Sequence, residues 1–488
     1  MKNGTWLQTI LKTELHPSVK DRMISGIQFD SRKVKSGDVF VAIPGLKVDG
    51  TQFAISALEK GASFVVSEKS KPETVLDNGW IQVENVRKSL AVISSEFYDN
   101  PTKKLTVIGV TGTNGKTTTT YLIKSILDSL GLKTGIIGTT GSLIGDRKVE
   151  LSHTTPESLE LNQLFAEMVS EKITHIVMEV SSHALDLYRV YGINFKVAVF
   201  SNLTHDHLDY HGNFENYFAA KKKLFDSLTS ESFAVINADD QYGKRIVSDT
   251  KGKISTYGLD TVSSIHGTIL SSDIYSMKLK VNAELECHVF EFPLSGKFNA
   301  YNTLAAIGVA ECLGYKITEL EAGLHNAKQV PGRFEKVKSD KGLIGVVDYS
   351  HTPDSLEKIL QTISEIRKPS QKIITVFGCG GDRDKTKRPI MGEIAGKYSD
   401  TVIVTSDNPR TENPNQILQD ILVGCKNYSP SVEVDRHIAI EKAVELAQTQ
   451  DIILVAGKGH EDYQEIKGVK THFDDREELR KAFLKYEK

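Results

Sequence analysis

Residues 107–118 join an apolar strand to a glycine-rich loop that ends in lysine and threonine, Val-Ile-Gly-Val-Thr-Gly-Thr-Asn-Gly-Lys-Thr-Thr. Glycines let successive backbone N–H groups turn toward one anion, and the helix that follows presents the positive end of its dipole. Lys116 adds a positive charge, and the Thr117 hydroxyl suits Mg2+. The segment therefore predicts a site for the polyphosphate of ATP. The predicted contacts are Gly112, Thr113, Asn114, Gly115, Lys116, Thr117 and Thr118.

The loop departs from the usual phosphate-binding spacing, because Val110 stands where the first glycine of G-x-x-x-x-G-K-[ST] belongs. Its surroundings still fit such a site. Residues 107–110 form a short apolar run, and apolar residues then recur at helical spacing until Gly131. An ordinary glycine turn between a strand and a helix is the alternative interpretation.

A carboxylate and several histidines follow two further predicted strands. Glu179 lies in Met178-Glu-Val-Ser-Ser-His183, and His207 lies in the segment 202–212. At adjacent strand ends these two side chains are suited to complete a second Mg2+ position beside Thr117, although histidine is an uncommon ligand for that ion. Two alternatives stay open, a polar surface loop and a zinc site. Zinc is disfavoured because no further ligands have structural spacing. The histidines concerned are His183, His205, His207 and His211.

A run of three lysines, Lys221-Lys-Lys223, falls on a helical pattern that begins near Tyr217. A lysine run on a helix is by default a solvated face.

The order of the predicted elements divides the chain into three units. At 488 residues the chain is longer than one hydrophobic core usually supports. Short strands and helices alternate over residues 1–98, and Asn100-Pro-Thr102 interrupts the pattern. The linker Val330-Pro-Gly-Arg333 separates two further α/β patterns. We expect an N-terminal domain over 1–98, a central ATP-binding domain over 99–330 and a C-terminal domain over 331–488.

The central pattern predicts a doubly wound, mainly parallel sheet, with strands at 107–110, 135–138, 173–180, 197–200 and 234–237. Period-two stretches over 253–293 predict an antiparallel insertion, and a helix follows at 296–313. The third unit is Rossmann-like, with strands predicted at 344–347, 373–377, 402–405 and 452–456. The fold class is therefore α/β.

Composition excludes several classes of protein. The formal net charge is −3 with 25% charged residues, which gives no basic field for nucleic acid. Cys287, Cys312, Cys379 and Cys425 form no C-x-x-C pair, so we expect reduced thiols. No stretch has the length and apolar character of a signal peptide or a membrane span. We expect a soluble, cytoplasmic protein.

Taken in order, these motifs and those near the two ends of the chain resemble the Mur ligases of bacterial cell-wall synthesis, and the resemblance extends over all three units. The N-terminal motifs are Asp30-Ser-Arg32, Gly37-Asp-Val-Phe-Val-Ala42 and Asp49-Gly50. The central motifs are residues 112–118, Glu179-Val-Ser-Ser-His183, Asp206-His-Leu-Asp-Tyr-His-Gly212 and Ala219-Ala-Lys221. The C-terminal motifs are Gly381-Asp-Arg383, Asp407-Asn-Pro-Arg410 and Gly457-Lys-Gly-His-Glu461.

The resemblance implies ATP-dependent amide ligation through an acyl phosphate. It implies catalytic roles for Lys116, Glu179, His207 and Lys221, with Lys221 carbamylated so that it supplies a carboxylate to the second of two Mg2+ ions. The implied metal ligands are Thr117, Glu179, His207 and carbamylated Lys221. On the far side of ATP it implies contacts from Asn299, Asn302, Arg333 and Asp348.

The resemblance also implies two further small-molecule substrates and a monomer. For a UDP-N-acetylmuramoyl dipeptide the matching residues are Phe29, Ser31, Thr154, Thr155, Ser181 and Arg189. For meso-diaminopimelate they are Arg383, Asp407, Asn408, Pro409, Arg410, Gly457 and Glu461.

Arg410 favours diaminopimelate over L-lysine, because the second carboxylate of diaminopimelate needs a planar, bidentate donor. L-Lysine as the added amino acid remains an alternative, and a ligase similar to folylpolyglutamate synthetases is another. A nucleotide-switch protein is disfavoured, since the chain lacks a guanine-reading Asn-Lys-x-Asp and a switch has no need of Lys221.

Overall fold

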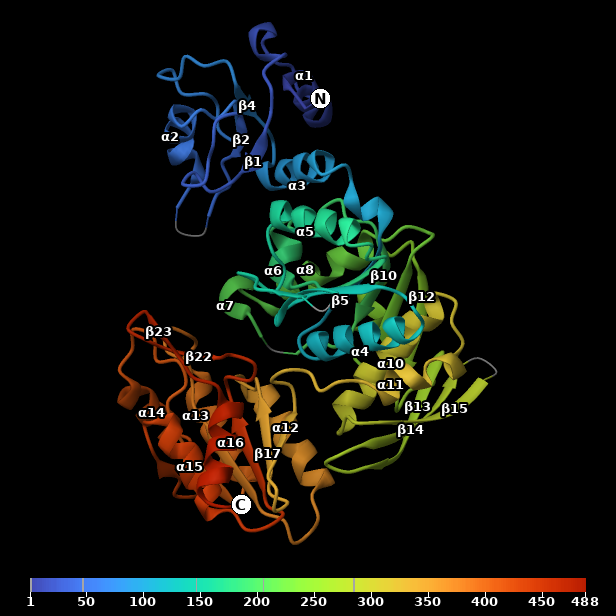
Figure 1. Cartoon of the computed structure of the whole chain (residues 1–488), viewed down its shortest axis with the longest axis vertical. Helices are drawn as coiled ribbons and strands as arrows, with labels where there is room; N and C mark the ends of the chain where they lie inside the picture. The colour runs from blue at the N-terminus through green and yellow to red at the C-terminus, as the bar shows by residue number, and fades with distance from the viewer. Residues whose placement is uncertain (1, 46–47, 146, 205, 284–285) are drawn as a thin grey trace.

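The computed structural model describes residues 2–45, 48–145, 147–204, 206–283 and 286–488. Figure 1 shows three units that follow one another along the chain, the N-terminal unit at the top, the central unit in the middle and the C-terminal unit below. The described strands form sheets of four, 11, six and two strands. None of the helices in the described ranges is long and apolar enough to cross a membrane.

The N-terminal unit is a parallel sheet with helices around it, as the alternating pattern predicts. Its strands are β1 (Gly26–Gln28), β2 (Asp38–Val41), β3 (Phe64–Ser67) and β4 (Trp80–Gln82), which pair in that order. Its helices are α1 (Gly4–Leu11), η1 (Pro17–Val19), η2 (Gly50–Phe53), α2 (Ala54–Glu59) and α3 (Val86–Phe97). Every residue of β2 and β3 is buried, as expected for parallel strands covered on both faces. The turn η3 (Pro101–Lys104) leads into the central unit.

The phosphate-loop strand β5 (Thr106–Thr111) lies in the middle of the central sheet, between β9 (His175–Glu179) and β10 (Phe195–Phe200). All three strands are parallel. Their carboxyl ends therefore meet at one edge, which is where open α/β sheets bind ligands. The phosphate loop, Glu179 and the segment after Phe200 all start from this edge.

The central sheet continues on both sides of these strands. Beyond β9 come β6 (Thr134–Gly138), β7 (Gly141–Ile144) and β8 (Arg147–Val149). Beyond β10 come β11 (Phe233–Asn237), β12 (Lys253–Gly258), β13 (Ile265–Ser272), β14 (Met277–Ala283) and β15 (Glu286–Phe292). The predicted antiparallel insertion exists in β13–β15. The prediction is wrong for residues 253–258, since β12 pairs parallel with β11 and extends the parallel part of the sheet.

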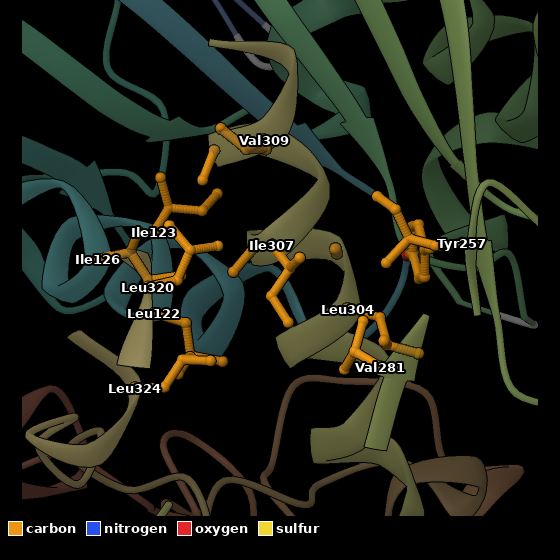
Figure 2. Close-up of a cluster of buried hydrophobic side chains, with 14 of the residues drawn as sticks. Leu122, Ile123, Ile126, Tyr257, Val281, Leu304, Ile307, Val309, Leu320 and Leu324 are labelled. Atoms are coloured by element: carbon orange, nitrogen blue, oxygen red, sulfur yellow. The ribbon is translucent and has the colours of Figure 1, made fainter. Parts of the chain in front are cut away.

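The helices of the central unit cover its sheet. They are α4 (Lys116–Ser129), α5 (Ser158–Ser170), α6 (Ser182–Asp186), α7 (Leu208–His211), α8 (Phe214–Asp226), α9 (Gly243–Ile246), α10 (Lys297–Cys312), η4 (Ile317–Glu319) and α11 (Glu321–His325). Helix α10 packs against α4 and is apolar on nearly every side. Figure 2 shows Leu122, Ile123 and Ile126 of α4 meeting Ile307 of α10 and Leu324 of α11 in one buried cluster. This core fixes the helix that begins at the phosphate loop.

The C-terminal unit is a second α/β sheet. Its strands, in spatial order, are β16 (Glu335–Lys338), β17 (Ile344–Asp348), β21 (Ile452–Ala456), β18 (Ile373–Phe377), β19 (Thr401–Val404) and β20 (Ser431–Val432), and only β16 is antiparallel to its neighbour. Its helices are α12 (Pro353–Ile366), α13 (Lys387–Tyr398), α14 (Pro414–Leu422), α15 (Arg436–Leu446) and α16 (Asp475–Lys485), and β22 (Tyr463–Ile466) pairs with β23 (Val469–His472). The four predicted strands are all present.

Candidate functional site: an ATP loop between two α/β units

Two positions of the phosphate loop admit only glycine. Gly112 has φ +145°, and a Cβ there would lie 2.0 Å from the Ser201 Oγ. Gly115 caps α4 with φ +86°, and its Cβ would lie 2.4 Å from the Asn302 Oδ1. A side chain at either position would therefore be strained and would collide with its neighbour. Val110 replaces the first glycine of the usual phosphate-binding motif. This replacement does not disturb the loop, because Val110 is a buried residue of β5.

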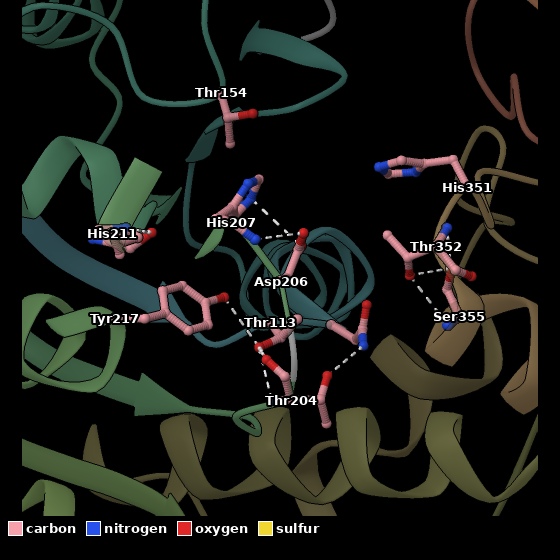
Figure 3. A network of polar contacts seen from close by, with 12 residues as sticks. Thr113, Thr154, Thr204, Asp206, His207, His211, Tyr217, His351, Thr352 and Ser355 are labelled. Atoms are coloured by element: carbon pink, nitrogen blue, oxygen red, sulfur yellow. Dashed lines mark hydrogen bonds and ion pairs between the residues drawn. The ribbon is translucent and has the colours of Figure 1, made fainter. Parts of the chain in front are cut away.

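The segment after β10 holds the loop in shape. The Thr113 N–H donates to the Asn202 carbonyl at 2.8 Å, and the Asn114 N–H donates to the Asn202 Oδ1 at 3.0 Å. The Thr204 N–H donates to the Thr113 Oγ1 at 3.0 Å, and the Tyr217 hydroxyl lies 3.1 Å from the same oxygen. Figure 3 shows Thr113 between Thr204 and Tyr217. The loop is thus pre-organised by residues that the phosphate motif does not contain.

Two lysines face the loop, the partly buried Lys116 and the buried Lys221. Lys116 Nζ donates to the Gly112 carbonyl at 2.9 Å, and Lys221 Nζ donates to the same carbonyl at 2.8 Å. Burial lowers the pKa of Lys116, and the charges of Glu179 and Asp206 oppose this shift. Burial also lowers the pKa of Lys221 well below its usual value; the charge of Lys116 lowers it further, and the charge of Asp206 opposes the shift. Lys221 is 1% exposed, so the solvated-face interpretation of the lysine run is wrong for this residue.

The other two lysines of the run behave as surface residues. Lys222 pairs with Asp226 and Asp249, and Lys223 pairs with Asp186. Within one turn of α8, the Lys221 side chain is therefore buried, whereas Lys222 and Lys223 form ion pairs nearer the surface.

The proposed metal ligands gather around the loop. Thr117 is buried in the first turn of α4, and Glu179 accepts hydrogen bonds from the Thr139 N–H at 2.9 Å and the Thr139 hydroxyl at 3.0 Å. His207 is half-exposed at φ +54°, with its ring 3.4 Å from the Asp206 carboxylate (Figure 3). Across the described residues no three His, Cys, Asp or Glu side chains are grouped closely enough to hold a metal ion. His205 lies outside the described residues. A small number of protein oxygens beside a phosphate loop is enough for Mg2+, because phosphate oxygens and water supply its other ligands.

Asn299 and Asn302 of α10 lie together beside the loop. The Asn302 Nδ2 donates to the Asn299 Oδ1 at 3.2 Å, and the Asn302 Oδ1 accepts from the Thr119 hydroxyl at 3.3 Å. Both asparagines are buried, so the helix does not present them as a polar face toward solvent.

The C-terminal unit supplies a cation and a carboxylate at the same place. The Arg333 guanidinium lies 4.7 Å from the centre of the Tyr349 ring. Burial is the main cause of the lowered pKa of Lys116 in the phosphate loop, and the charge of Arg333 lowers it further. Burial raises the pKa of Asp348, whose carboxylate accepts from the Phe334 N–H at 2.7 Å. These contacts fix the linker between the two units.

One carboxylate connects the C-terminal unit directly to the phosphate loop, and the sequence pattern did not single it out. The Asp354 Oδ2, in the first turn of α12, accepts from the Asn114 Nδ2 at 2.9 Å and from the Thr204 hydroxyl at 3.1 Å. Nearby, burial lowers the pKa of His351 to about 4, which leaves its ring neutral at pH 7. In Figure 3 His351 and Thr352 lie across from Asp206. The candidate ATP site is therefore bounded by both units.

Four of the six residues predicted for the UDP-linked substrate lie beside Glu179. The Thr155 hydroxyl donates to the Glu179 carbonyl at 2.9 Å and accepts from the Ser181 N–H at 3.1 Å. The Thr154 hydroxyl lies 3.2 Å from that of Thr139. The Arg189 Nη1 donates to the Thr155 carbonyl at 3.0 Å. The other two, Phe29 and Ser31, lie in the N-terminal unit, where Phe29 packs against the hydrophobic core and the Ser31 carbonyl accepts from Lys60.

Glu157 ties this group to the N-terminal unit. Its carboxylate accepts from the Arg189 Nε at 2.9 Å and from the Arg87 Nη1 at 3.2 Å, and Arg87 also donates to the Pro44 carbonyl at 3.1 Å. Glu157 is 8% exposed, so this pairing is shielded from solvent. Sequence patterns missed Glu157, which reads locally as the first residue of a helical capping box.

The residues predicted for diaminopimelate lie in three loops, at the carboxyl ends of β18, β19 and β21. The Asn408 Nδ2 donates to the Glu461 Oε2 at 2.8 Å, and a Cβ on Gly457 would lie 3.5 Å from the Asp407 Oδ2. Lys458, which is fully buried, donates to the Asn408 Oδ1 at 3.1 Å. Burial and the nearby charge of Asp407 raise the pKa of Glu461, which Lys458 opposes. Buried Asp407 Oδ1 lies 3.7 Å from Lys458 Nζ and accepts no hydrogen bond among the described residues, so it can still accept one from a ligand.

Arg410 and Arg383 both lie beside the backbone of Gly380. The Arg410 Nη1 donates to the Gly381 carbonyl at 2.8 Å. A Cβ on Gly380 would lie 2.9 Å from the Arg410 Nη1 and 4.0 Å from the Arg383 Cγ. Pro409 links the strand end to Arg410, whose φ is +51°. The side chains of Arg383 and Arg410 thus lie on the same stretch of backbone, around Gly380.

Family models match successive parts of the chain. Residues 23–98 match the Mur ligase family catalytic domain, residues 110–310 the Mur ligase middle domain, and residues 332–459 the Mur ligase glutamate ligase domain.

Similar proteins agree with these matches. One from Clostridium botulinum is 45% identical, with 96% of this chain and 98% of the relative covered, and bears the name UDP-N-acetylmuramoyl-L-alanyl-D-glutamate–2,6-diaminopimelate ligase. One from Clostridium acetobutylicum, named as the first such ligase of that organism, is 47% identical with 93% of each chain covered. A solved structure bearing the same enzyme name is 35% identical, with a TM-score of 0.72 over 99% of each chain. With a phosphate loop closed by a C-terminal α/β unit and relatives of this similarity over nearly its whole length, the chain belongs to the Mur ligase family.

Proposed function

We propose that this chain is the ATP-dependent ligase that adds meso-diaminopimelate to the D-glutamyl side-chain carboxylate of UDP-N-acetylmuramoyl-L-alanyl-D-glutamate. The observation that carries the proposal is the 45% identity, over 96% of this chain, to a relative named for this ligation. The products would be the tripeptide precursor, ADP and phosphate. The reaction would belong to peptidoglycan synthesis, and so to cell-wall biogenesis, cell shape and division, and we propose a cytoplasmic monomer.

The first chemical step brings two anions together, since a carboxylate attacks the γ-phosphate of ATP to form an acyl phosphate. Positive charge has to be in place before they meet. The N–H groups of residues 112–118 and the Lys116 ammonium would hold the phosphates, and Arg333 would add a second cation from the C-terminal unit. The Asn299–Asn302 pair and Asp348 would contact the adenosine end. Asp354 links Asn114 to α12, which ties the position of the loop to that of the C-terminal unit.

Mg2+ would neutralise the phosphates and polarise the γ-phosphoryl group. Thr117, Glu179, His207 and carbamylated Lys221 would hold two ions. Burial supports the last assignment, because the lowered pKa of Lys221 favours the neutral amine that reacts with carbon dioxide.

In the second step the amine of diaminopimelate attacks the acyl phosphate, and the tetrahedral intermediate collapses to the amide and phosphate. Asp407 and Glu461 would receive the amino group at the far end of diaminopimelate, while Arg410 and Arg383 would bind the carboxylate there. Asn408, Pro409 and Gly457 would shape the site.

We assign the domain boundaries near residues 98 and 330, between α3 and β5 and between α11 and β16.

A product analysis tests the reaction itself. Incubation with ATP, Mg2+, the UDP-linked dipeptide and meso-diaminopimelate is expected to yield a UDP-linked tripeptide by mass spectrometry. ADP formation without a new peptide product would refute the proposal.

Glu157→Gln is expected to raise the KM for the UDP-linked dipeptide about tenfold, because it weakens the charged hydrogen bonds that orient Arg189. Steady-state kinetics with each substrate varied in turn measures the effect, and the KM for ATP should change little. Glu167→Gln is the matched control, since Glu167 lies on the same helix α5 and pairs with exposed Arg147. An equal rise in all three KM values would contradict a role in orienting Arg189.

A further inference from the structure

A fully buried ion pair lies under the amino-acid pocket. Arg436 is the first residue of α15 and Asp475 the first residue of α16, and both side chains are 0% exposed. The Arg436 Nε and Nη2 donate to the two oxygens of Asp475, each at 2.7 Å. This bidentate pairing fixes the plane of the guanidinium group.

The same guanidinium also reaches two strand ends. Its Nη2 donates to the Ala456 carbonyl at 3.1 Å, and its Nη1 donates to the Ser406 carbonyl at 3.4 Å. Ala456 directly precedes Gly457, and Ser406 directly precedes Asp407. Arg436 thus contacts the base of two of the three loops that form the candidate diaminopimelate pocket.

These two loops start from strands that do not pair with each other. In the six-stranded sheet β18 lies between β21 and β19. Sheet hydrogen bonds therefore do not set the distance between Ser406 and Ala456 directly. Arg436 joins the two carbonyls across the end of β18, and lysine, with one nitrogen, has no comparable reach.

The charge of Arg436 also acts on the pocket. Burial opposes the ionised guanidinium, yet the carboxylates of Asp475, Asp407 and Glu461 raise its pKa above the usual value. The buried cation thus attracts the carboxylates of Asp407 and Glu461, which would receive the ammonium group of the ligand.

We propose that Arg436, held by Asp475, is a positioning residue that sets the spacing of the loops 407–410 and 457–461 and so controls affinity for the amino-acid substrate. The part of this inference that concerns the substrate rests on the proposed function. Stability alone does not require such a pair, because apolar residues of similar volume often replace a buried ion pair without loss of stability.

The test compares Arg436→Lys and the double variant Arg436→Met with Asp475→Leu against the wild-type protein. Arg367→Lys is the control, since Arg367 pairs with Asp400 at the opposite end of β19. Amide hydrogen exchange without substrates reports the order of the two loops. Steady-state kinetics then gives the KM for diaminopimelate, ATP and the UDP-linked dipeptide separately.

We expect exchange in both loops to rise about tenfold in the Arg436 variants, and the KM for diaminopimelate to rise about tenfold, as for loss of one charge-assisted hydrogen bond. The other two KM values and the Arg367→Lys protein should stay near wild type. Unchanged loop exchange, or an equal rise in all three KM values, would overturn the inference. If both loops loosen but the wild-type enzyme never requires diaminopimelate, the positioning role stands and the proposed function fails.

Discussion

Replacing Lys221 with alanine is expected to lower the turnover number about a thousandfold, the scale seen when a group that stabilises transition-state charge is removed. The reason is its position. Lys221 is buried against the Gly112 carbonyl of the phosphate loop, next to Lys116, where a carbamate would place a carboxylate among the phosphates and cations. Steady-state phosphate release from ATP measures the loss. Added bicarbonate should not restore activity, because alanine has no amine to carbamylate.

Two controls separate this role from a loss of folding. Lys221→Met keeps most of the buried volume and should be as inactive as the alanine variant. Lys222→Ala removes the neighbouring lysine, which pairs with Asp226 and Asp249 at the surface, and should retain nearly full activity. Near wild-type turnover of Lys221→Ala would rule out a carbamate in the reaction.

Arg410→Ala is expected to lower kcat/KM for diaminopimelate about 100-fold while leaving the KM for ATP nearly unchanged. A loss of about 100-fold is typical when one partner of a buried, hydrogen-bonded charge pair is removed. Arg410 lies beside Gly380 and Gly381 in the C-terminal unit, and its Nη1 donates to the Gly381 carbonyl. Initial rates with diaminopimelate and ATP varied separately give the two values.

Arg410→Lys sharpens this comparison, because it retains the charge and loses the planar pair of donors. It should recover only part of the lost kcat/KM. Equal losses for ATP and diaminopimelate in either variant would show that Arg410 affects the whole enzyme rather than the distal carboxylate.

The phosphate loop and the positions of most strands along the chain could be predicted from the sequence because they depend on local patterns. Residues 107–118 carry apolar, glycine and lysine signals within a dozen positions, and β17, β18, β19 and β21 are continuous apolar runs. Strand β12 was mistaken for part of the antiparallel insertion, since alternation along one strand does not reveal the direction of its neighbour.

The burial of Lys221 could not be predicted from its own segment, where it is one of three identical side chains. Only the resemblance to a family singled it out, and only the packing of α8 against the phosphate loop explains why Lys221 is buried while Lys223 pairs at the surface.

Residues that position other residues were even harder to identify from the local sequence. Glu157 has the pattern of a helix cap, and Asp354 that of a first-turn acid. Arg436 and Asp475 are far apart in the sequence and meet only because α15 and α16 pack together. Long-range pairs of this kind depend on the assembled fold, so a single sequence does not reveal them.

The most direct test of the central claim is the rate of phosphate release from ATP with the UDP-linked dipeptide and either meso-diaminopimelate or L-lysine. The account predicts turnover that requires both the dipeptide and diaminopimelate, with a far lower kcat/KM for lysine. Efficient turnover with lysine would retain the ligase chemistry and contradict the assignment of Arg410 to the distal carboxylate. Phosphate release that depends on neither the dipeptide nor an amino acid would contradict the proposed function as a whole.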